Sequence, residues 1–221
     1  MISLQKEVKI LVVGSTGVGK TSLIKQFCRG TYTDEYSKTV GVDFMEKVQH
    51  VDYLKQDVKI MLWDTVGEDA FNSITRNYYK GAAAAVLVFS TTDRESFEAL
   101  AKWRDMVVEE CGEVAMAIVQ NKVDLIERAA MSSEEAEAMA RRLNLRFYRT
   151  CVKEDLNVAS VLTYLVELHA KKARLKIDNI EKVMDSGGRT PRASLSMSES
   201  LKVQLQQQKQ ASRRTSKCLL M

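Results

Sequence analysis

The chain has 221 residues, of which 45% are hydrophobic and 28% are charged, with one Pro and ten Gly. This composition suits a globular domain with a sizeable core and excludes a collagen-like or Pro-rich chain. The net charge of +4 belongs to the part after residue 175, where nine Lys and Arg accompany four Asp and Glu; the preceding residues sum to −1, so nucleic-acid binding by the folded part is not expected.

Strand-like and helix-like segments alternate along the first 175 residues. Apolar, β-branched patterns predict strands at 8–14, 43–53, 57–64, 82–90, 114–121 and 145–151, the second and third of which form a hairpin. Helical spacing predicts helices at 20–27, 93–110, 132–144 and 157–174. The alternation predicts an α/β domain of three layers, a mostly parallel six-stranded sheet with helices on both faces. Ligands of such sheets bind at the carboxyl ends of the strands.

The composition changes after about residue 176. Residues 185–200 are small and polar, and residues 201–214 are rich in Gln. Neither stretch supplies enough apolar surface to offset the entropy lost on ordering. We therefore predict a folded domain at 1–175 and a flexible, disordered tail at 176–221; a short induced helix around 199–210 is the alternative.

The segment "GSTGVGKT" at 14–21 fits the phosphate-binding pattern G-x-x-x-x-G-K-[ST]. Glycines at 14, 17 and 19 let the backbone turn its N–H groups toward phosphates, and the following helix adds its positive end. Lys20 is expected to reach the β- and γ-phosphates, and the Thr21 hydroxyl is expected to bind Mg²⁺. A Gly-rich loop that arose by chance is the alternative, but the strand before it and the helix after it argue against that.

The segment "NKVD" at 121–124 ends a predicted strand. The Asp124 carboxylate can accept two N–H hydrogen bonds from the edge of guanine, whereas adenine would leave it unpaired. Asn121 would brace the surrounding loops, and Lys122 would cover the plane of the base. An ATP-binding P-loop protein is an alternative that competition binding would expose.

Together with "TCVK" at 150–153, these stretches resemble the Ras superfamily of small GTPases over residues 8 to about 175. This resemblance implies a P-loop G domain that binds GTP and GDP with Mg²⁺. "VGVDF" (40–44), "KIMLWDT" (59–65) and "YYKGA" (78–82) look specifically like the Rab family. "LVFSTTDRESFEA" and "LRFYRTCVKEDLNV" look closest to the Rab subfamily linked to cilia and hedgehog signalling.

The resemblance also implies the role of individual residues. Thr39 and Asp64 would join Thr21 around Mg²⁺, Gly67 would donate its N–H to the γ-phosphate, and Tyr32 would stack edge-on against guanine. Cys151 stands where Ser is usual, which predicts a weaker hydrogen bond bracing the loop near guanine O6. The implied nucleotide-binding residues are Ser15, Thr16, Gly17, Val18, Gly19, Lys20, Thr21, Ser22, Tyr32, Thr39, Gly67, Asn121, Lys122, Asp124, Cys151, Val152 and Lys153.

Three aromatic residues match the trio through which Rab proteins present their nucleotide state to effectors. They are Phe44, Trp63 and Tyr78. Periodicity alone leaves core packing open for Trp63 and Tyr78. Trp103 has no counterpart in this trio and is predicted to be a core residue.

Glu68 occupies the position where the family usually carries a catalytic Gln. A Gln amide can both accept a hydrogen bond from the attacking water and donate one to the phosphoryl group, whereas an ionised Glu only accepts. With Lys20 and Gly67 as the other catalytic residues, we expect slow intrinsic hydrolysis. Two alternatives are a working GTPase that tolerates Glu68 and an interaction module that stays GTP-bound.

The final residues "CLLM" fit the C-a-a-X pattern and predict farnesylation of Cys218. One prenyl group anchors weakly, and Arg213, Arg214 and Lys217 would supply the second signal at an anionic leaflet. The chain opens without a signal-peptide pattern and lacks an apolar run of the roughly 20 residues that span a bilayer. We therefore expect a monomer, cytosolic or peripheral on a membrane, in vesicle or ciliary trafficking, whose partners are an exchange factor, a GTPase-activating protein and effectors.

Overall fold

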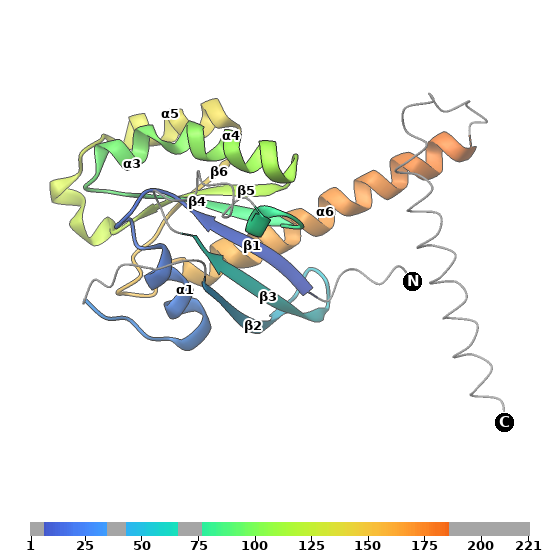
Figure 1. Cartoon of the computed structure of the whole chain (residues 1–221), viewed down its shortest axis with the longest axis horizontal. Coiled ribbons are helices and arrows are strands. Elements are labelled where there is room, and N and C mark those ends of the chain that lie inside the picture. Colours follow the sequence, from blue (N-terminus) through green and yellow to red (C-terminus); the bar gives the residue numbers. More distant parts are fainter. Residues whose placement is uncertain (1–6, 35–42, 66–76, 186–221) are drawn as a thin grey trace. The chain divides into compact units, whose positions relative to one another are not determined.

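The computed structural model describes residues 7–34, 43–65 and 77–185, with side chains as far as Asn179 (Figure 1). Six strands form one sheet in the order β2-β3-β1-β4-β5-β6. Only β2 is antiparallel to its neighbour, and the other adjacent strands are parallel. The strands are β1 (Glu7–Val13), β2 (Asp43–Val51), β3 (Gln56–Asp64), β4 (Ala84–Ser90), β5 (Ala115–Asn121) and β6 (Arg146–Arg149). The predicted sheet and hairpin are confirmed.

Helices cover both faces of this sheet. Their bounds are α1 (Lys20–Arg29), α3 (Arg94–Glu98), α4 (Leu100–Cys111), α5 (Ser133–Leu143) and α6 (Val158–Asp185), with a 3-10 helix η2 (Val123–Arg128). One core contains Leu23 of α1 and Leu162 of α6, and the other contains Trp103 of α4 and Ala140 of α5. Helices α1 and α6 therefore pack on one face and α3 to α5 on the other, as Figure 1 shows. The three-layer prediction is confirmed, and Trp103 is a core residue.

The burial of each strand follows its place in the sheet. All seven residues of β4 and all seven of β5 are buried, because these central strands are covered on both faces. Strand β2 lies at one edge and leaves most of its residues exposed or half-buried. The parallel register pairs Val12 of β1 with Asp64 of β3, so the ends of both strands meet beside the loop that follows β1.

Two helices differ from the sequence predictions. The helix predicted at 93–110 is divided at Ala99, whose ψ of −10° interrupts the regular helix between α3 and α4. Helix α6 continues to Asp185, so residues 176–185, which we predicted to belong to the tail, are helical. No Gly or Pro lies between Arg174 and Gly187, so nothing local stops the helix there.

The chain divides into two compact units, at 1–174 and 175–221. That boundary lies one residue from the predicted one, while the disorder predicted for the tail stays a prediction.

None of the helices in the described ranges has the length and apolarity needed to cross a membrane.

Candidate nucleotide-binding site

The loop between β1 and α1 follows a path that glycine alone fits at two positions. Gly14 has φ of 148°, and a Cβ there would lie 2.1 Å from the carbonyl oxygen of Val88. Gly19 has φ of 98°, and a Cβ there would lie 2.3 Å from Nδ2 of Asn121. Because Gly19 has no side chain to cap α1, the first N–H groups of this helix stay available to an anion.

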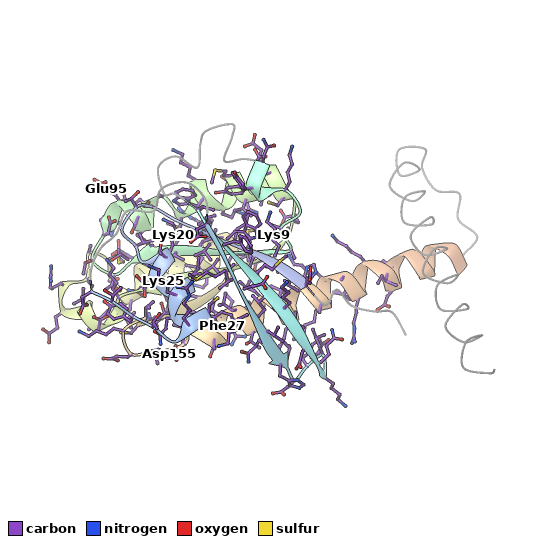
Figure 2. All side chains as sticks on the ribbon, turned by 60° about the horizontal axis from the view of Figure 1, so that its bottom comes forward. Lys9, Lys20, Lys25, Phe27, Glu95 and Asp155 are labelled. Carbon is purple, nitrogen blue, oxygen red and sulfur yellow. The ribbon has the colours of Figure 1, made fainter. Side chains whose placement is uncertain are left out.

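Lys20, labelled in Figure 2, is the first residue of α1, and its ammonium group folds back over the preceding loop. Its Nζ donates hydrogen bonds of 2.8 Å to the carbonyl oxygens of Gly14 and Ser15. Burial lowers the pKa of Lys20 to about 8, although the negative charge of Asp64 partly opposes this shift. Keeping a buried ammonium group protonated costs free energy, and a bound anion would offset that cost. The surroundings of Lys20 therefore favour an anionic ligand.

This pKa predicts a pH-dependent affinity for GDP. Above pH 8 the free protein loses the Lys20 proton, whereas bound phosphates would hold it, so binding must then take up a proton. We expect the affinity to fall by about tenfold between pH 7 and pH 9, measured by equilibrium titration. A Lys20→Met variant should bind more weakly and show a flatter pH profile. A wild-type profile as flat as that of the variant would contradict the assignment.

Two oxygen-bearing side chains meet beside the phosphate loop. The Thr21 hydroxyl donates a 2.5 Å hydrogen bond to Oδ2 of Asp64, which is 3% exposed at the end of β3. Next to it, the Thr65 hydroxyl donates to the carbonyl oxygen of Val12 and fixes the ends of β1 and β3 together. A hydroxyl and a carboxylate are hard oxygen donors, so the pair fits Mg²⁺.

Asn121 and Lys122 tie the phosphate loop to the loop after β5. Asn121 Nδ2 donates a 2.9 Å hydrogen bond to the carbonyl oxygen of Val18, and Lys122 Nζ donates one of 2.8 Å to that of Gly17. The two contacts span 103 and 105 residues of sequence. Two loops predicted separately from sequence motifs therefore form one continuous surface at the carboxyl edge of the sheet.

Two buried threonines that sequence analysis missed hold Asn121 in place. Thr150 Oγ1 donates to Oδ1 of Asn121 at 3.1 Å, and Thr91 Oγ1 donates to its carbonyl oxygen at 2.8 Å. Both threonines have exposed fractions of 0%. Each directly follows a strand, β6 for Thr150 and β4 for Thr91. A small polar residue at the carboxyl end of a strand was the signal available in the sequence.

Asp124 lies in the first turn of η2 beside the bridge between Cys151 and Leu156 and stays exposed, as a residue that meets a ligand must be. The Cys151 thiol is buried and donates to Oδ1 of Asp124 at 3.3 Å. Burial raises the pKa of Cys151, so the thiol stays protonated and keeps this donor. Tyr32 donates its hydroxyl to Asp34 at 2.8 Å, and this hydrogen bond, with burial, raises the pKa of Tyr32 to about 12.

The other predicted nucleotide-binding residues differ in exposure. Val18 and Val152 are buried, so only their backbone can meet a ligand. Ser15, Thr16, Thr21 and Ser22 are half-buried, whereas Gly17 and Lys153 are exposed. Thr39, Gly67 and Glu68 lie outside the described residues, and their predicted roles stay predictions.

Replacing Cys151 with Ser should strengthen the brace on Asp124. A hydroxyl is a better hydrogen-bond donor than a thiol. We expect dissociation of a fluorescent GDP analogue to slow by about threefold to tenfold, in line with a net gain of about 1 kcal/mol. Cys111→Ser is the matched control, because that thiol donates instead to the carbonyl oxygen of Tyr79. An unchanged or faster release in Cys151→Ser would show that the thiol does not limit the brace.

Phe44, Trp63 and Tyr78 lie together on the surface. The ring centroids of Phe44 and Trp63 are 5.4 Å apart, and those of Trp63 and Tyr78 are 5.9 Å apart. Phe44 is 52% exposed and Tyr78 39% exposed, so core packing is wrong for Tyr78, while Trp63 is half-buried. Sequence analysis missed Lys9, whose Nζ lies 4.2 Å from the centroid of the Trp63 ring and donates to the carbonyl oxygens of Tyr78 and Lys80.

Comparison with known proteins places this site in a family. A sequence model of the Ras family matches residues 9–171. The chain is 34% identical to Ras-related protein Rab-13 of Bos taurus over 175 residues, which cover 77% of this chain and 85% of that protein. It is 35% identical to Rab-13 of Rattus norvegicus, over 71% of this chain and 77% of that protein. It is 34% identical to Ras-related protein Rab-3 of Caenorhabditis elegans, over 77% of each chain.

The sheet order, the phosphate loop and the tied base loops define a guanine-nucleotide-binding G domain of the Ras type. Within that class, the chain belongs to the Rab family of small GTPases. It is therefore a GTP-binding switch and a GTPase that works with regulators and effectors. Its likeness to the cilia-linked subfamily stays a prediction.

Proposed function

We propose that this Rab-family GTPase hydrolyses GTP slowly by itself and, when GTP-bound, recruits effectors to a membrane in vesicle or ciliary trafficking. The observation that supports the switch most directly is the pair of hydrogen bonds from Asn121 and Lys122 to the phosphate loop. They make one rigid surface from the residues that would meet the phosphates and those that would meet the base.

At the phosphate end, we assign charge neutralisation to Lys20 and metal binding to Thr21 and Asp64, with Thr39 as a further ligand. Lys20 would exchange its carbonyl partners, Gly14 and Ser15, for phosphate oxygens. Mg²⁺, when bound, would neutralise charge on the β- and γ-phosphates. Gly67 would donate its N–H to the γ-phosphate, and the protein would add little covalent chemistry beyond positioning.

At the base end, we assign guanine recognition to the Asp124 carboxylate, with backbone contacts from the loop of Cys151, Val152 and Lys153. The Cys151 thiol donates a hydrogen bond to Oδ1 of the Asp124 carboxylate and so helps to hold that carboxylate in place. Lys122 would lie against the base plane while its Nζ holds Gly17. Competition between GTP and ATP tests this assignment, since an ATP-binding protein would show no preference for guanine.

The nucleotide content of freshly purified full-length protein separates a cycling enzyme from a module that stays GTP-bound. A GTPase that turns over in the cell should carry mostly GDP. A hydrolysis-deficient interaction module should carry mostly GTP. Chromatography of the released nucleotide measures this ratio directly, and we expect a GTP fraction above that of a Rab protein with Gln at this position.

We propose that effectors dock on the aromatic trio of Phe44, Trp63 and Tyr78. Clustered aromatic rings that reach the surface are the type of group that carries much of the energy of protein interfaces. Phe44 belongs to β2 and Trp63 to β3, the strands next to the segments outside the described residues that carry Thr39 and Gly67. A change at the γ-phosphate would thereby reach the trio through its own strands.

We also propose farnesylation of Cys218 as the membrane anchor, supported by the motif "CLLM" and by the basic residues Arg213, Arg214 and Lys217. Mass spectrometry of the protein from a eukaryotic host would show one farnesyl group, which Cys218→Ser removes. Flotation with vesicles should then require both the lipid and an anionic surface. An unmodified Cys218 would leave the membrane role without its anchor.

A further inference from the structure

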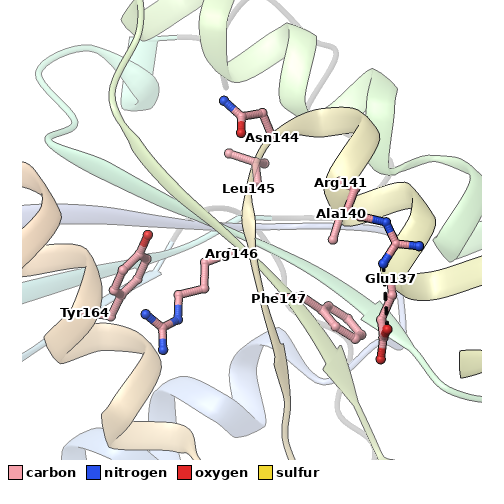
Figure 3. A pocket seen from close by; sticks show the side chains of 8 residues that line it. All are labelled: Glu137, Ala140, Arg141, Asn144, Leu145, Arg146, Phe147 and Tyr164. Atoms are coloured by element: carbon pink, nitrogen blue, oxygen red, sulfur yellow. Dashed lines mark ion pairs between the residues drawn. The ribbon is translucent and has the colours of Figure 1, made fainter. Parts of the chain in front are cut away.

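A surface hollow lies at the β6 edge of the sheet, away from the candidate nucleotide-binding residues. It is an open depression of about 490 Å³ lined by residues of α5, β6 and α6 (Figure 3). Strand β6 ends the sheet at the opposite side from β2, which carries Phe44 of the aromatic trio. Among the strands that the structure describes, β6 pairs with β5 alone, so its other edge faces this hollow, which we call the β6 groove. Its lining residues include Ala140, Leu145, Arg146, Phe147 and Tyr164.

The backbone of β6 offers hydrogen-bonding groups to the β6 groove. Thr150 N–H donates to the carbonyl oxygen of Gln120, which fixes the parity of the ladder with β5. By the alternation of a parallel ladder, Phe147 and Arg149 then turn their N–H and C=O groups away from β5. The Asn157 side chain agrees, since it donates to the carbonyl oxygen of Arg149 at 2.8 Å from outside the sheet. Phe147 N–H, Phe147 C=O and Arg149 N–H therefore face away from β5, where a further strand could pair with them; within the described part of the chain, β6 pairs with no second strand.

The ends of the β6 groove limit such a strand to a short segment. On one side, Leu145 N–H is already used by the carbonyl oxygen of Ala140 at 3.0 Å. On the other side, Asn157 occupies the carbonyl oxygen of Arg149. Three or four residues of an extended peptide would fill the span between these points, at about 3.3 Å a residue.

The two walls of the groove differ in chemistry, as Figure 3 shows. Phe147 lies on the α5 side near Ala140, and Leu145 shares the parity of Phe147 along the strand, so this wall offers apolar side chains next to β6, with Glu137, Arg141 and Asn144 of the lining around them. Arg146 points to the other side, toward Tyr164, and its Cζ lies 5.0 Å from the Tyr164 ring centroid and 5.4 Å from that of Tyr148. A guanidinium held against two neighbouring rings keeps its position and presents its donors to a carboxylate.

The charged residues around the β6 groove indicate which kind of partner it can bind. Glu137 is engaged by two arginines, Arg149 at 3.1 Å and Arg141 at 3.8 Å, so the arginines outnumber the acids around the groove. A second copy pairing edge to edge would bring like-charged arginines together. The chain's own C-terminal segment from Lys202 onward has five basic residues and no acidic one. We infer that the β6 groove binds a short extended peptide of a partner protein, with acidic and apolar residues in alternation, as an added strand on β6.

The binding test uses the full-length GDP-loaded protein and a fluorescein-labelled hexapeptide of alternating Glu and Val, followed by fluorescence polarisation. We expect saturable binding that weakens at least tenfold in Arg146→Glu and less than twofold in Arg142→Glu. Arg142 is an exposed arginine of α5 outside the lining of the groove, so it controls for net charge. Thermal unfolding of both variants verifies that each is folded. Absence of saturable binding, or equal losses in the two variants, overturns the proposal.

Strand pairing is tested on the unchanged protein, with two versions of the peptide. Each version carries N-methyl groups on alternate amides, one version on the odd positions and the other on the even positions. An added strand uses the amides of one parity only, so one version should lose binding and the other should keep it. Equal binding of both versions would show that the peptide is held without backbone hydrogen bonds to β6, and would overturn the assignment of an added strand.

Discussion

Replacing Glu68 with Gln is expected to accelerate single-turnover GTP hydrolysis by at least tenfold. An amide at this position would orient the attacking water and donate to the transferring phosphoryl oxygens, both with one side chain. An ionised carboxylate cannot donate, and it places a negative charge beside oxygens that are already anionic. A positioned transition-state donor is typically worth on the order of 10²–10³ in rate, so tenfold is a conservative expectation.

The measurement compares the full-length natural protein with Glu68→Gln, each loaded with GTP, with and without Mg²⁺. Asp69→Asn is the matched control, because it removes one negative charge from the next residue without supplying the amide at position 68. If Asp69→Asn accelerates hydrolysis as much as Glu68→Gln, charge alone is the brake. If neither variant is faster than the natural protein, Glu68 is a tolerated variant and the slow-hydrolysis proposal is wrong.

A slow intrinsic rate leaves room for regulation in the cell. The resemblance to the Rab family implies GTPase-activating proteins that supply a glutamine and an arginine of their own, and with such an activator the natural Glu68 would be compatible with stimulated turnover. We expect such an activator to narrow the difference between the natural protein and Glu68→Gln. A difference that persists under saturating activator would instead favour the module that stays GTP-bound.

Replacing Asp124 with Asn should produce the largest loss of guanine-nucleotide affinity, by a factor on the order of 10⁴. Guanine presents two N–H donors at the edge that the carboxylate would meet, and an amide can accept only one of them while opposing the other with its own donor. Sites built to hydrogen-bond a ligand reject a mismatched partner by about 10⁴–10⁵. The Cys151 thiol, which donates to Oδ1 of Asp124, would lose part of its acceptor as well.

Xanthosine diphosphate provides the rescue that separates recognition from folding. Xanthine carries a carbonyl oxygen where guanine has its exocyclic amine, and the side-chain amide introduced by Asp124→Asn has an N–H donor for that oxygen. We expect Asp124→Asn to bind this nucleotide more tightly than GDP, in a competition titration. Glu127→Gln, in the same 3-10 helix, is the charge-matched control and should bind GDP like the natural protein. Loss of both nucleotides in Asp124→Asn would indicate damage to the loop.

The aromatic trio and the β6 groove belong to different ends of the sheet, since β2 and β6 are its two edge strands. The trio adjoins the segments that carry Thr39 and Gly67, whereas the β6 groove is built from α5, β6 and α6. An effector on the trio should therefore depend on the nucleotide, and a peptide on β6 should bind in both nucleotide states. Two partners of different kinds can then occupy the protein together.

Local sequence patterns specify the secondary-structure elements and the local chemistry of this protein. Apolar patterns predicted the strands. In β4 and β5, for example, both faces are covered, so the sequence is a nearly continuous apolar run. The phosphate loop could be predicted from the sequence because its backbone needs a positive φ at Gly14 and Gly19, a local requirement that glycine meets. Family resemblance added roles for residues such as Thr39 and Glu68, which local patterns do not assign.

Tertiary structure alone decided which distant residues meet. Thr91 belongs to no motif, and Thr150 begins the stretch "TCVK" without an assigned role, yet both hold Asn121, because the strands β4, β5 and β6 end side by side. The sequence offers no reason for Lys9 in the largely apolar strand β1. The fold explains this residue, because β1 pairs with β3 and the Lys9 ammonium group lies over the Trp63 ring. Periodicity states which face of a strand is buried, but the partner across a loop or groove depends on how the whole chain folds, and that information is not local.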